Sequence, residues 1–207
     1  EAMIYGTAGY TAGLAIERLE TEGLTIEKDN VLVRGASGGV GMLSVLMLDK
    51  LGYDVVASTG RKDATDKLKT LGAKEVIDRL PEYDGKALGS RTWQAAIDPV
   101  GGESLANIIN KLDNNGSIAV IGMTGGTQFE SSVFPLILRG ISILGVDSVF
   151  TPIKLRKLVW RRLAKDLKPK QLHDIKEVIA FDDLPNGIER AMNHQHMGRI
   201  VVDFGVK

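Results

Sequence analysis

The sequence predicts an α/β protein built on a doubly wound parallel sheet. Six short apolar segments alternate with segments whose apolar residues recur at the three- and four-residue spacing of a helix. Parallel strands need crossover connections, usually helices, so this alternation favours a parallel sheet covered on both faces. A glycine-rich turn, Gly35–Gly41, also separates the first strand from the helix that follows it. Six strands in two halves complete the doubly wound pattern.

The first half of the chain is predicted to hold three of the strands. Val31–Val33 is an apolar run bounded by residues 29–30 and Gly35, which is typical of a buried strand. Helices are placed by apolar residues at helical spacing and by a glycine just beyond the last of them. The elements expected, in order, are a helix at 7–22, a strand at 31–33, a helix at 43–51, a strand at 54–58, a helix at 64–71 and a strand at 75–78.

The second half repeats the alternation and then changes character. Strands are expected at 93–98, 116–123 and 142–148, and a helix at 105–112. From Thr151 onward, the expected elements are a basic amphipathic helix at 153–167, a strand at 178–181, a helix at 184–193 and a strand at 199–204. We therefore expect a nucleotide-binding domain over 1–150 and a thin second segment over 151–207 that needs a partner.

Composition limits the classes of protein to be considered. The 207 residues carry no net charge and no cysteine, and no apolar run reaches 18 residues. These values give no support to nucleic acid or a membrane as a partner, and they exclude disulfides and thiolate metal sites. We expect a cytoplasmic protein acting on a small molecule. The chain begins at Glu1 and not at Met, and residues 2–12 look like the inside of a protein, so we expect it to be part of a longer protein.

The turn from Gly35 to Gly41 is the strongest functional signal. Gly35 permits a sharp turn, Gly38 and Gly39 allow a pyrophosphate to approach the backbone, and Gly41 allows the helix to pack closely on the sheet. The helix N-terminus supplies free amides for phosphate groups. Because the turn lies between a strand and a helix, it predicts a Rossmann-type dinucleotide site; the alternative is a purely structural turn. A Walker A loop is excluded, since no Gly-Lys-Ser/Thr follows.

The end of the second strand indicates which dinucleotide is bound. NAD sites usually carry an acidic residue there, which bonds to the ribose. Here the strand ends in Ser58, Thr59, Gly60, Arg61 and Lys62, with hydroxyl and cationic groups that suit a 2′-phosphate. The sequence therefore favours NADP(H) over NAD(H). The alternative is that Arg61 and Lys62 are only a solvated basic pair.

Several segments resemble one known family across the whole chain. The similar segments are 6–12 (GTAGYTA), 35–41, 58–61, 96–101 (AIDPVG), 134–139 (FPLILR), 145–149 (GVDSV) and 198–202 (GRIVV). They are similar to the zinc-free quinone oxidoreductase branch of the medium-chain dehydrogenase/reductase superfamily, and most of all to its acrylyl-CoA reductase (NADPH) group. Members carry a GroES-like catalytic domain split by the nucleotide-binding domain. The resemblance implies that the larger part of that domain precedes residue 1 and that 151–207 is its returning C-terminal part.

The same resemblance assigns roles to residues along the cofactor. It implies that Ser37, Gly38, Gly39 and Val40 contact the pyrophosphate, and that Ser58, Thr59, Gly60, Arg61 and Lys62 surround the 2′-phosphate. Arg79 would stack on the adenine. Met123, Ser148 and Asn193 would lie toward the nicotinamide, although packing explains Met123 and Ser148 equally well.

The resemblance also bears on metal, reaction and assembly. Zinc-dependent relatives supply a cysteine near residues 1–12, where this chain has none, so we expect no catalytic zinc, and we expect His173, His194 and His196 to lie on the surface. The implied reaction is NADPH-dependent hydride transfer to an activated C=C bond, as in acrylyl-CoA or a related enoyl thioester. The alternatives are a quinone reductase and a non-catalytic NADP(H)-binding module. No catalytic acid is assigned, because Tyr5 and Tyr10 fit packing roles better. A homodimer is expected through the strand at 142–149.

Overall fold

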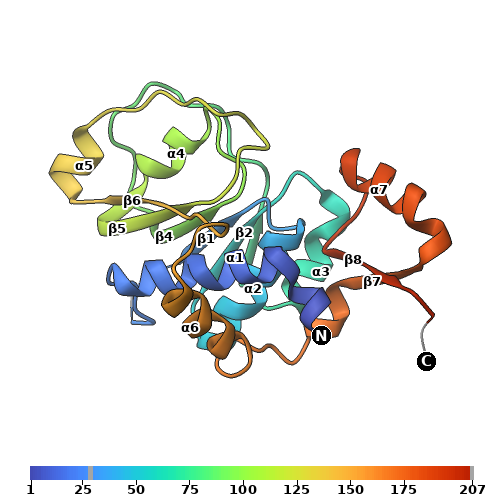
Figure 1. Cartoon of the computed structure of the whole chain (residues 1–207). Helices are drawn as coiled ribbons and strands as arrows, with labels where there is room; N and C mark the ends of the chain where they lie inside the picture. The colour runs from blue at the N-terminus through green and yellow to red at the C-terminus, as the bar shows by residue number, and fades with distance from the viewer. Residues whose placement is uncertain (28–29, 206–207) are drawn as a thin grey trace.

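A computed structural model describes residues 1–27 and 30–205, and it contains the predicted parallel sheet (Figure 1). The strands lie in the order β3-β2-β1-β4-β5-β6, and every pairing is parallel. Their bounds are β1 (Val31–Arg34), β2 (Val55–Ser58), β3 (Glu75–Ile77), β4 (Trp93–Asp98), β5 (Leu112–Val120) and β6 (Ser142–Gly145). The predicted doubly wound sheet is thus confirmed. Residue 29, predicted to bound the first strand, lies outside the described residues.

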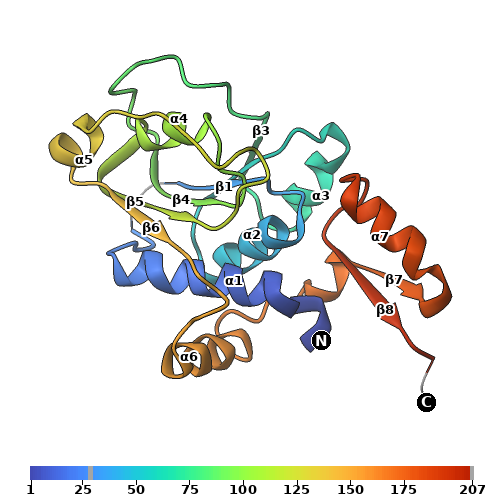
Figure 2. The same cartoon turned by 45° about the horizontal axis from the view of Figure 1, so that its top comes forward.

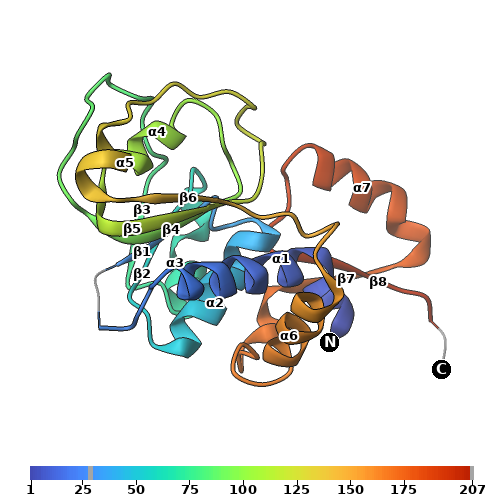
Figure 3. The same ribbon diagram turned by 60° about the vertical axis from the view of Figure 1, so that its left-hand side comes forward.

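Strands β1, β2, β4 and β5 contribute side chains to two separate cores. Along β1, Val31 and Val33 enter one core and Leu32 enters the other, as expected for a strand buried on both faces. The first core lies under α1 (Ala2–Thr21), α2 (Gly39–Leu51) and α3 (Thr65–Thr70). The second lies under α4 (Leu105–Ile109), with α5 (Phe134–Arg139) near the β6 edge, and Figure 3 shows the two helical layers on either side of the sheet.

The helices follow the predicted pattern but differ at their ends. The helix predicted at 7–22 begins earlier, at Ala2, and is interrupted at Gly6, whose φ of 49° and ψ of −151° are not helical. The helix predicted at 64–71 is divided into a 3₁₀ turn at Lys62–Ala64 and α3. The helix predicted at 43–51 begins at Gly39, so the glycine turn leads directly into α2.

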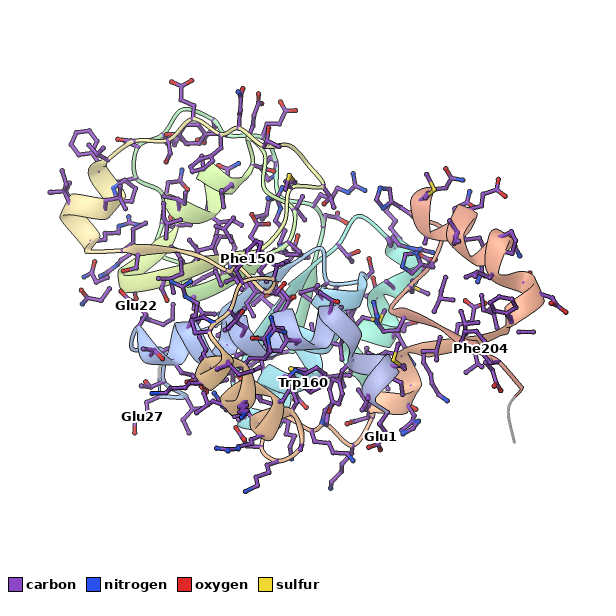
Figure 4. The ribbon with its side chains drawn as sticks, viewed as in Figure 1. Glu1, Glu22, Glu27, Phe150, Trp160 and Phe204 are labelled. Atoms are coloured by element: carbon purple, nitrogen blue, oxygen red, sulfur yellow. The ribbon has the colours of Figure 1, made fainter. Side chains whose placement is uncertain are left out.

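Helix α6 (Ile153–Leu163) packs on α1 and not on the C-terminal strands. Its residues Val159 and Leu163 are buried in the first core. Trp160, labelled on this helix in Figure 4, has its ring centroid 6.0 Å from that of Tyr10, on which it stacks. Arg162 adds ion pairs to Glu17, Glu20 and Asp166. Helix α6 therefore packs, with α1, on the first core. The domain boundary predicted at 150/151 stays a prediction, and its second segment ends in residues 206–207, outside the described part.

The last part of the chain forms a small unit beside the main sheet. Strands β7 (Lys176–Ala180) and β8 (Arg199–Asp203) pair in parallel, and the connection between them contains α7 (Leu184–Met192), to the right of the main sheet in Figure 2. Arg199 attaches the unit by donating from Nε to the carbonyl of Ile4 at 3.0 Å. The N–H of Gly198 donates to the carbonyl of Ser37 in the glycine turn at 3.0 Å. The small unit is thereby anchored beside the predicted phosphate site.

None of the helices in the described ranges is long and apolar enough to cross a membrane.

Candidate functional site

The glycine turn has the geometry that its sequence predicts. Gly35 adopts a φ of 58°, which side chains disfavour, and its carbonyl accepts a hydrogen bond from the N–H of Gly38 at 3.0 Å. A Cβ on Gly41 would lie 2.3 Å from the carbonyl oxygen of Gly35, so only glycine fits there. The turn therefore presses against the first turn of α2, whose N–H groups have no acceptor within the helix. Such a helix end attracts phosphate groups.

A cleft of about 680 Å³ opens at this turn. It lies at the carboxyl ends of β1, β2 and β4, where the strand order reverses between β1 and β4. Ligands of doubly wound sheets bind at this kind of reversal. The cleft is lined by residues 34–35, 37–41, 58–61, 79–80, 99–100, 104, 124–125, 194 and 196.

Ser37, Ser58 and Thr59 line the cleft and carry hydroxyl groups. Ser37 and Thr59 are hydrogen-bonded to each other, with 2.9 Å between Oγ and Oγ1. Ser58 donates from its Oγ to the carbonyl of Asp78 at 3.0 Å, which ties the end of β2 to the residue after β3. Ser58 and Thr59 are almost fully buried, at 1% and 6% exposure. These hydroxyls come from the end of β2, from the residue after it and from the glycine turn, and the structure brings them together at the cleft.

The cations predicted for the 2′-phosphate, Arg61 and Lys62, and the one predicted for the adenine, Arg79, occupy three different environments. Arg61 lines the cleft, and its guanidinium is bonded to the carboxylate of Asp63. Arg79 also lines the cleft and lies against Gly60, where a Cβ would come 2.0 Å from the Arg79 Nε. Lys62 lies instead in an adjoining hollow of about 130 Å³, which shares Thr59 and Arg61 with the cleft. A side chain at residue 60 would therefore displace the Arg79 side chain from its present position.

The end of β4 contributes groups that the sequence reasoning missed. Asp98 is completely buried, and its carboxylate accepts hydrogen bonds from the N–H groups of Val100 and Gly101 at 2.9 and 3.0 Å. Arg34, at the end of β1, donates to the same carboxylate at 3.2 Å and to the carbonyl of Gly101 at 2.9 Å. This network fixes the loop that forms one wall of the cleft. The available signal was a charged residue at the end of each of two apolar strands.

Three residues predicted near the nicotinamide do not line the cleft. Met123 is 67% exposed, although its neighbour Thr124 does line it. Ser148 offers its carbonyl to Arg156 at 2.9 Å, and Asn193 is exposed at the end of α7. Their contacts with a cofactor stay predictions.

Two histidines reach the cleft from the small C-terminal unit. His194 and His196 line it from the connection between α7 and β8, far along the chain from the glycine turn. Their approach was not predicted, because nothing local to residues 193–197 indicates where that connection lies.

Neither tyrosine considered as an acid lies at the cleft. Tyr5 donates from its hydroxyl to the carbonyl of Leu163 at 3.1 Å, and burial raises its pKa to about 12. Tyr10 is 2% exposed, and its ring contacts both Trp160 and the guanidinium of Arg156. Both residues join helix α1 to the α6 region, which supports packing roles. Across residues 1–27 and 30–205, no group of three or more His, Cys, Asp or Glu side chains could hold a metal ion.

The cleft fits a nicotinamide dinucleotide in shape and in chemistry. Its volume falls within the range of about 300–1,000 Å³ typical of small-molecule sites. A Cβ on Gly38 would lie 3.4 Å from the Gly35 carbonyl, so the turn carries no side chain where a pyrophosphate would approach. Hydroxyl and guanidinium groups lie farther along, at the end of β2. These features suit phosphate, ribose and 2′-phosphate in that order.

The fold and this cleft together define a Rossmann-type domain. The chain belongs to the zinc-binding dehydrogenase family, whose model matches residues 39–165, more than half of the 207 residues. The predicted resemblance to the quinone oxidoreductase and acrylyl-CoA reductase branch is confirmed by two curated relatives. The chain is 51% identical to "Putative quinone oxidoreductase YhfP" of Bacillus subtilis and 40% identical to acrylyl-CoA reductase AcuI of Ruegeria pomeroyi. Each match covers 98% of this chain and 62% of the relative, so the chain spans less than two thirds of either protein.

Two solved structures show the same architecture. Bacillus subtilis yhfP with NAD bound superposes with a TM-score of 0.95 at 50% identity, over 98% of this chain and 63% of that one. The yhdH oxidoreductase from Salmonella enterica in complex with NADP superposes with a TM-score of 0.94 at 39% identity, over 100% of this chain and 63% of that one. The two relatives were thus crystallised with different dinucleotides.

Proposed function

We propose that this chain binds NADP(H) in the cleft at the carboxyl ends of β1, β2 and β4, as the cofactor-binding part of an oxidoreductase. The observation that carries the proposal is the glycine turn at residues 35–41, packed so closely against α2 that a side chain at Gly41 would overlap the backbone. The buried hydroxyls of Ser58 and Thr59 and the guanidinium groups of Arg61 and Arg79 support the phosphate-bearing cofactor.

Dissociation constants for NADPH and NADH, measured by fluorescence titration on this chain, test the proposal. We expect both dinucleotides to bind and NADPH to bind more tightly. Thr59→Val should weaken both, because it removes the hydroxyl paired with Ser37 while conserving volume. Thr70→Val is the matched control, since Thr70 is exposed on α3 and only donates to the carbonyl of Asp66. Failure of the unmodified chain to bind either dinucleotide would overturn the proposal.

The reaction we propose is reduction of a C=C bond conjugated to a carbonyl, with acrylyl-CoA or a related enoyl thioester as substrate. Bound NADPH would supply the hydride. The residues of this chain would hold the cofactor: α2 and the glycine turn at the pyrophosphate, and Ser58, Thr59 and Arg61 at the adenosine end. Precise placement of this kind accounts for much of the rate gained when two reactants meet. A quinone is the alternative substrate, and the name of the Bacillus subtilis relative favours it.

Steady-state oxidation of NADPH with acrylyl-CoA and with a quinone separates these candidates. We expect residues 1–207 to bind NADPH without turning over either substrate, and a longer form with the rest of the catalytic domain to prefer the thioester. This division follows from the small C-terminal unit, whose side chains Val178, Phe181, Ile188, Met192 and Phe204 are half-exposed or more. We infer that 151–207 is the returning part of that domain and that the rest of it covers this apolar surface. Turnover of either substrate by residues 1–207 would contradict the inference that catalysis needs the rest of the domain. We also propose that the protein acts in the cytoplasm.

We also propose that two copies pair through the strand predicted at 142–149. Its paired part, β6, is an edge strand of the sheet, and Ile143 on it is 39% exposed. Next to it, Val133, Phe134, Ile137, Leu138, Val149 and Phe150 are all more than half exposed. An apolar surface beside an unpaired strand edge is a common site of two-fold pairing. Light scattering should show a dimer for the unmodified chain and a monomer for Ile143→Lys. The control Val178→Lys should remain a dimer. An unmodified chain that is monomeric would refute the proposal.

A further inference from the structure

The guanidinium of Arg61 is hydrogen-bonded to groups within the protein. Its Nε and Nη2 donate to the two carboxylate oxygens of Asp63 at 3.2 and 2.8 Å, a two-point contact between planar groups. Its Nη1 donates to the carbonyl of His196 at 3.0 Å. Each of the three guanidinium nitrogens therefore has an acceptor, and two of these contacts belong to Asp63.

Asp63 also neutralises the charge of Arg61. The hydrogen bonds from Arg61 lower the pKa of the Asp63 carboxyl, so this group is ionised at neutral pH. Residues 58–62 contain no acid, but Asp63 follows them directly. The 3₁₀ turn at Lys62–Ala64 brings Asp63 back toward Arg61, the residue two positions before it.

Arg79 provides the comparison within the same cleft. Its side chain lies against Gly60 and lines the cleft, but in the described part of the chain it makes no ion pair or hydrogen bond. Two guanidinium groups thus face the adenosine end, one paired with a carboxylate and one not. A 2′-phosphate bound there gains the full attraction of Arg79 and only part of the attraction of Arg61.

We propose that Asp63 is a specificity-determining residue that acts through Arg61 and limits the preference of this site for NADP(H) over NAD(H). The inference rests on the proposed cofactor site and deepens it. Asp63 occupies two of the donors that a phosphate would use and cancels the charge that would attract it. NADH carries no 2′-phosphate, so its affinity does not depend on whether Arg61 is free.

The variant Asp63→Asn removes the charge and conserves the size of the side chain. Exposed charge pairs typically shift an equilibrium a few-fold, and a phosphate carries up to about two charges, so we expect NADPH to bind about three- to tenfold more tightly. The dissociation constant of NADH should change by less than about twofold. Asp66→Asn is the matched control, because Asp66 is an exposed acid in the adjoining helix α3 without an ion pair in the described ranges, and it should leave both constants unchanged.

The same substitution in a chain that lacks the Arg61 guanidinium distinguishes an effect of Asp63 through Arg61 from direct repulsion between the Asp63 carboxylate and the 2′-phosphate. In an Arg61→Gln chain, the further change Asp63→Asn should alter NADPH affinity by less than about twofold. Thermal unfolding of each variant checks that the chain is folded, and 2′-AMP against 5′-AMP repeats the comparison without the nicotinamide half.

The outcomes separate this inference from the proposed function. If Asp63→Asn leaves the ratio of NADPH to NADH affinities unchanged or lowers it, the inference is wrong and the cofactor site stands. If the full gain persists in the Arg61→Gln background, Asp63 does not act through Arg61 and the inference is again wrong. If the unmodified chain binds neither dinucleotide, the proposed function and the inference fail together.

Discussion

Substitution of Gly41 by alanine tests whether the glycine turn is packed as tightly as the structure indicates. An added Cβ would lie 2.3 Å from the carbonyl oxygen of Gly35, 2.6 Å from the Cα of Ala36 and 2.8 Å from its carbonyl carbon. Carbon atoms in favourable contact lie about 3.5–4.0 Å apart, so the turn must move by roughly 1 Å. Since all three atoms are backbone, no side-chain rotation can relieve the overlap.

The change in the free energy of unfolding that Gly41→Ala causes is the sum of two opposing effects. Overpacking destabilises by about 1–3 kcal/mol, and the upper end applies here because only backbone atoms could move to relieve the overlap. Alanine in place of glycine within a helix stabilises by about 1 kcal/mol. We therefore expect Gly41→Ala to lower the free energy of unfolding by about 2 kcal/mol, or the melting temperature by about 4–8 °C for a chain of this size.

Differential scanning fluorimetry with and without NADPH measures both the stability and the site. NADPH at a hundred times its dissociation constant should stabilise the unmodified chain by about 2.7 kcal/mol, and Gly41→Ala should lose most of this gain because the turn is displaced. Gly38→Ala is the control for stability: its Cβ would meet only the Gly35 carbonyl, at 3.4 Å, and we expect it to cost less than about 1 kcal/mol. An unchanged melting temperature for Gly41→Ala, together with a full NADPH shift, would refute the reasoning.

Two further predictions concern buried groups. Asp98→Asn should lower the free energy of unfolding, measured in urea, by about 3–5 kcal/mol, because Arg34 would be left buried without its anion. The control is Asp54→Asn, which breaks an exposed pair with Lys74 and should cost less than about 1 kcal/mol. Equal effects of the two substitutions would contradict this account. Burial raises the pKa of Tyr5 to about 12, so its stabilising contribution is complete below about pH 10 and is lost as the pH rises toward 12. Stability measured from pH 9 to 11.5 should therefore fall more steeply in the unmodified chain than in Tyr5→Phe, and identical slopes would show that Tyr5 ionises freely.

Much of the fold and part of the site could be predicted because their signals are local. A buried parallel strand needs an apolar run, a helix needs apolar residues at its own period, and a pyrophosphate turn needs glycine where backbones meet. These requirements act within a few residues, so the roles of the segments that meet them can be predicted from the sequence, as for Val31–Val33, Gly35–Gly41 and Ser58–Thr59. The doubly wound class followed from the same alternation, since right-handed crossovers leave few other arrangements.

By itself, the sequence determined the doubly wound sheet, the phosphate turn and the hydroxyl and basic groups after β2. Only the tertiary structure decided how those groups are used. It paired Arg34 with Asp98 across two strands, folded Asp63 back onto Arg61, and brought His196 to the cleft from the opposite end of the chain. The physical reason is that the pairing of Arg34 with Asp98 and the position of His196 depend on where separate elements meet in space. The contact between Arg61 and Asp63 is local, but residue type alone does not show whether a charge is free or already neutralised.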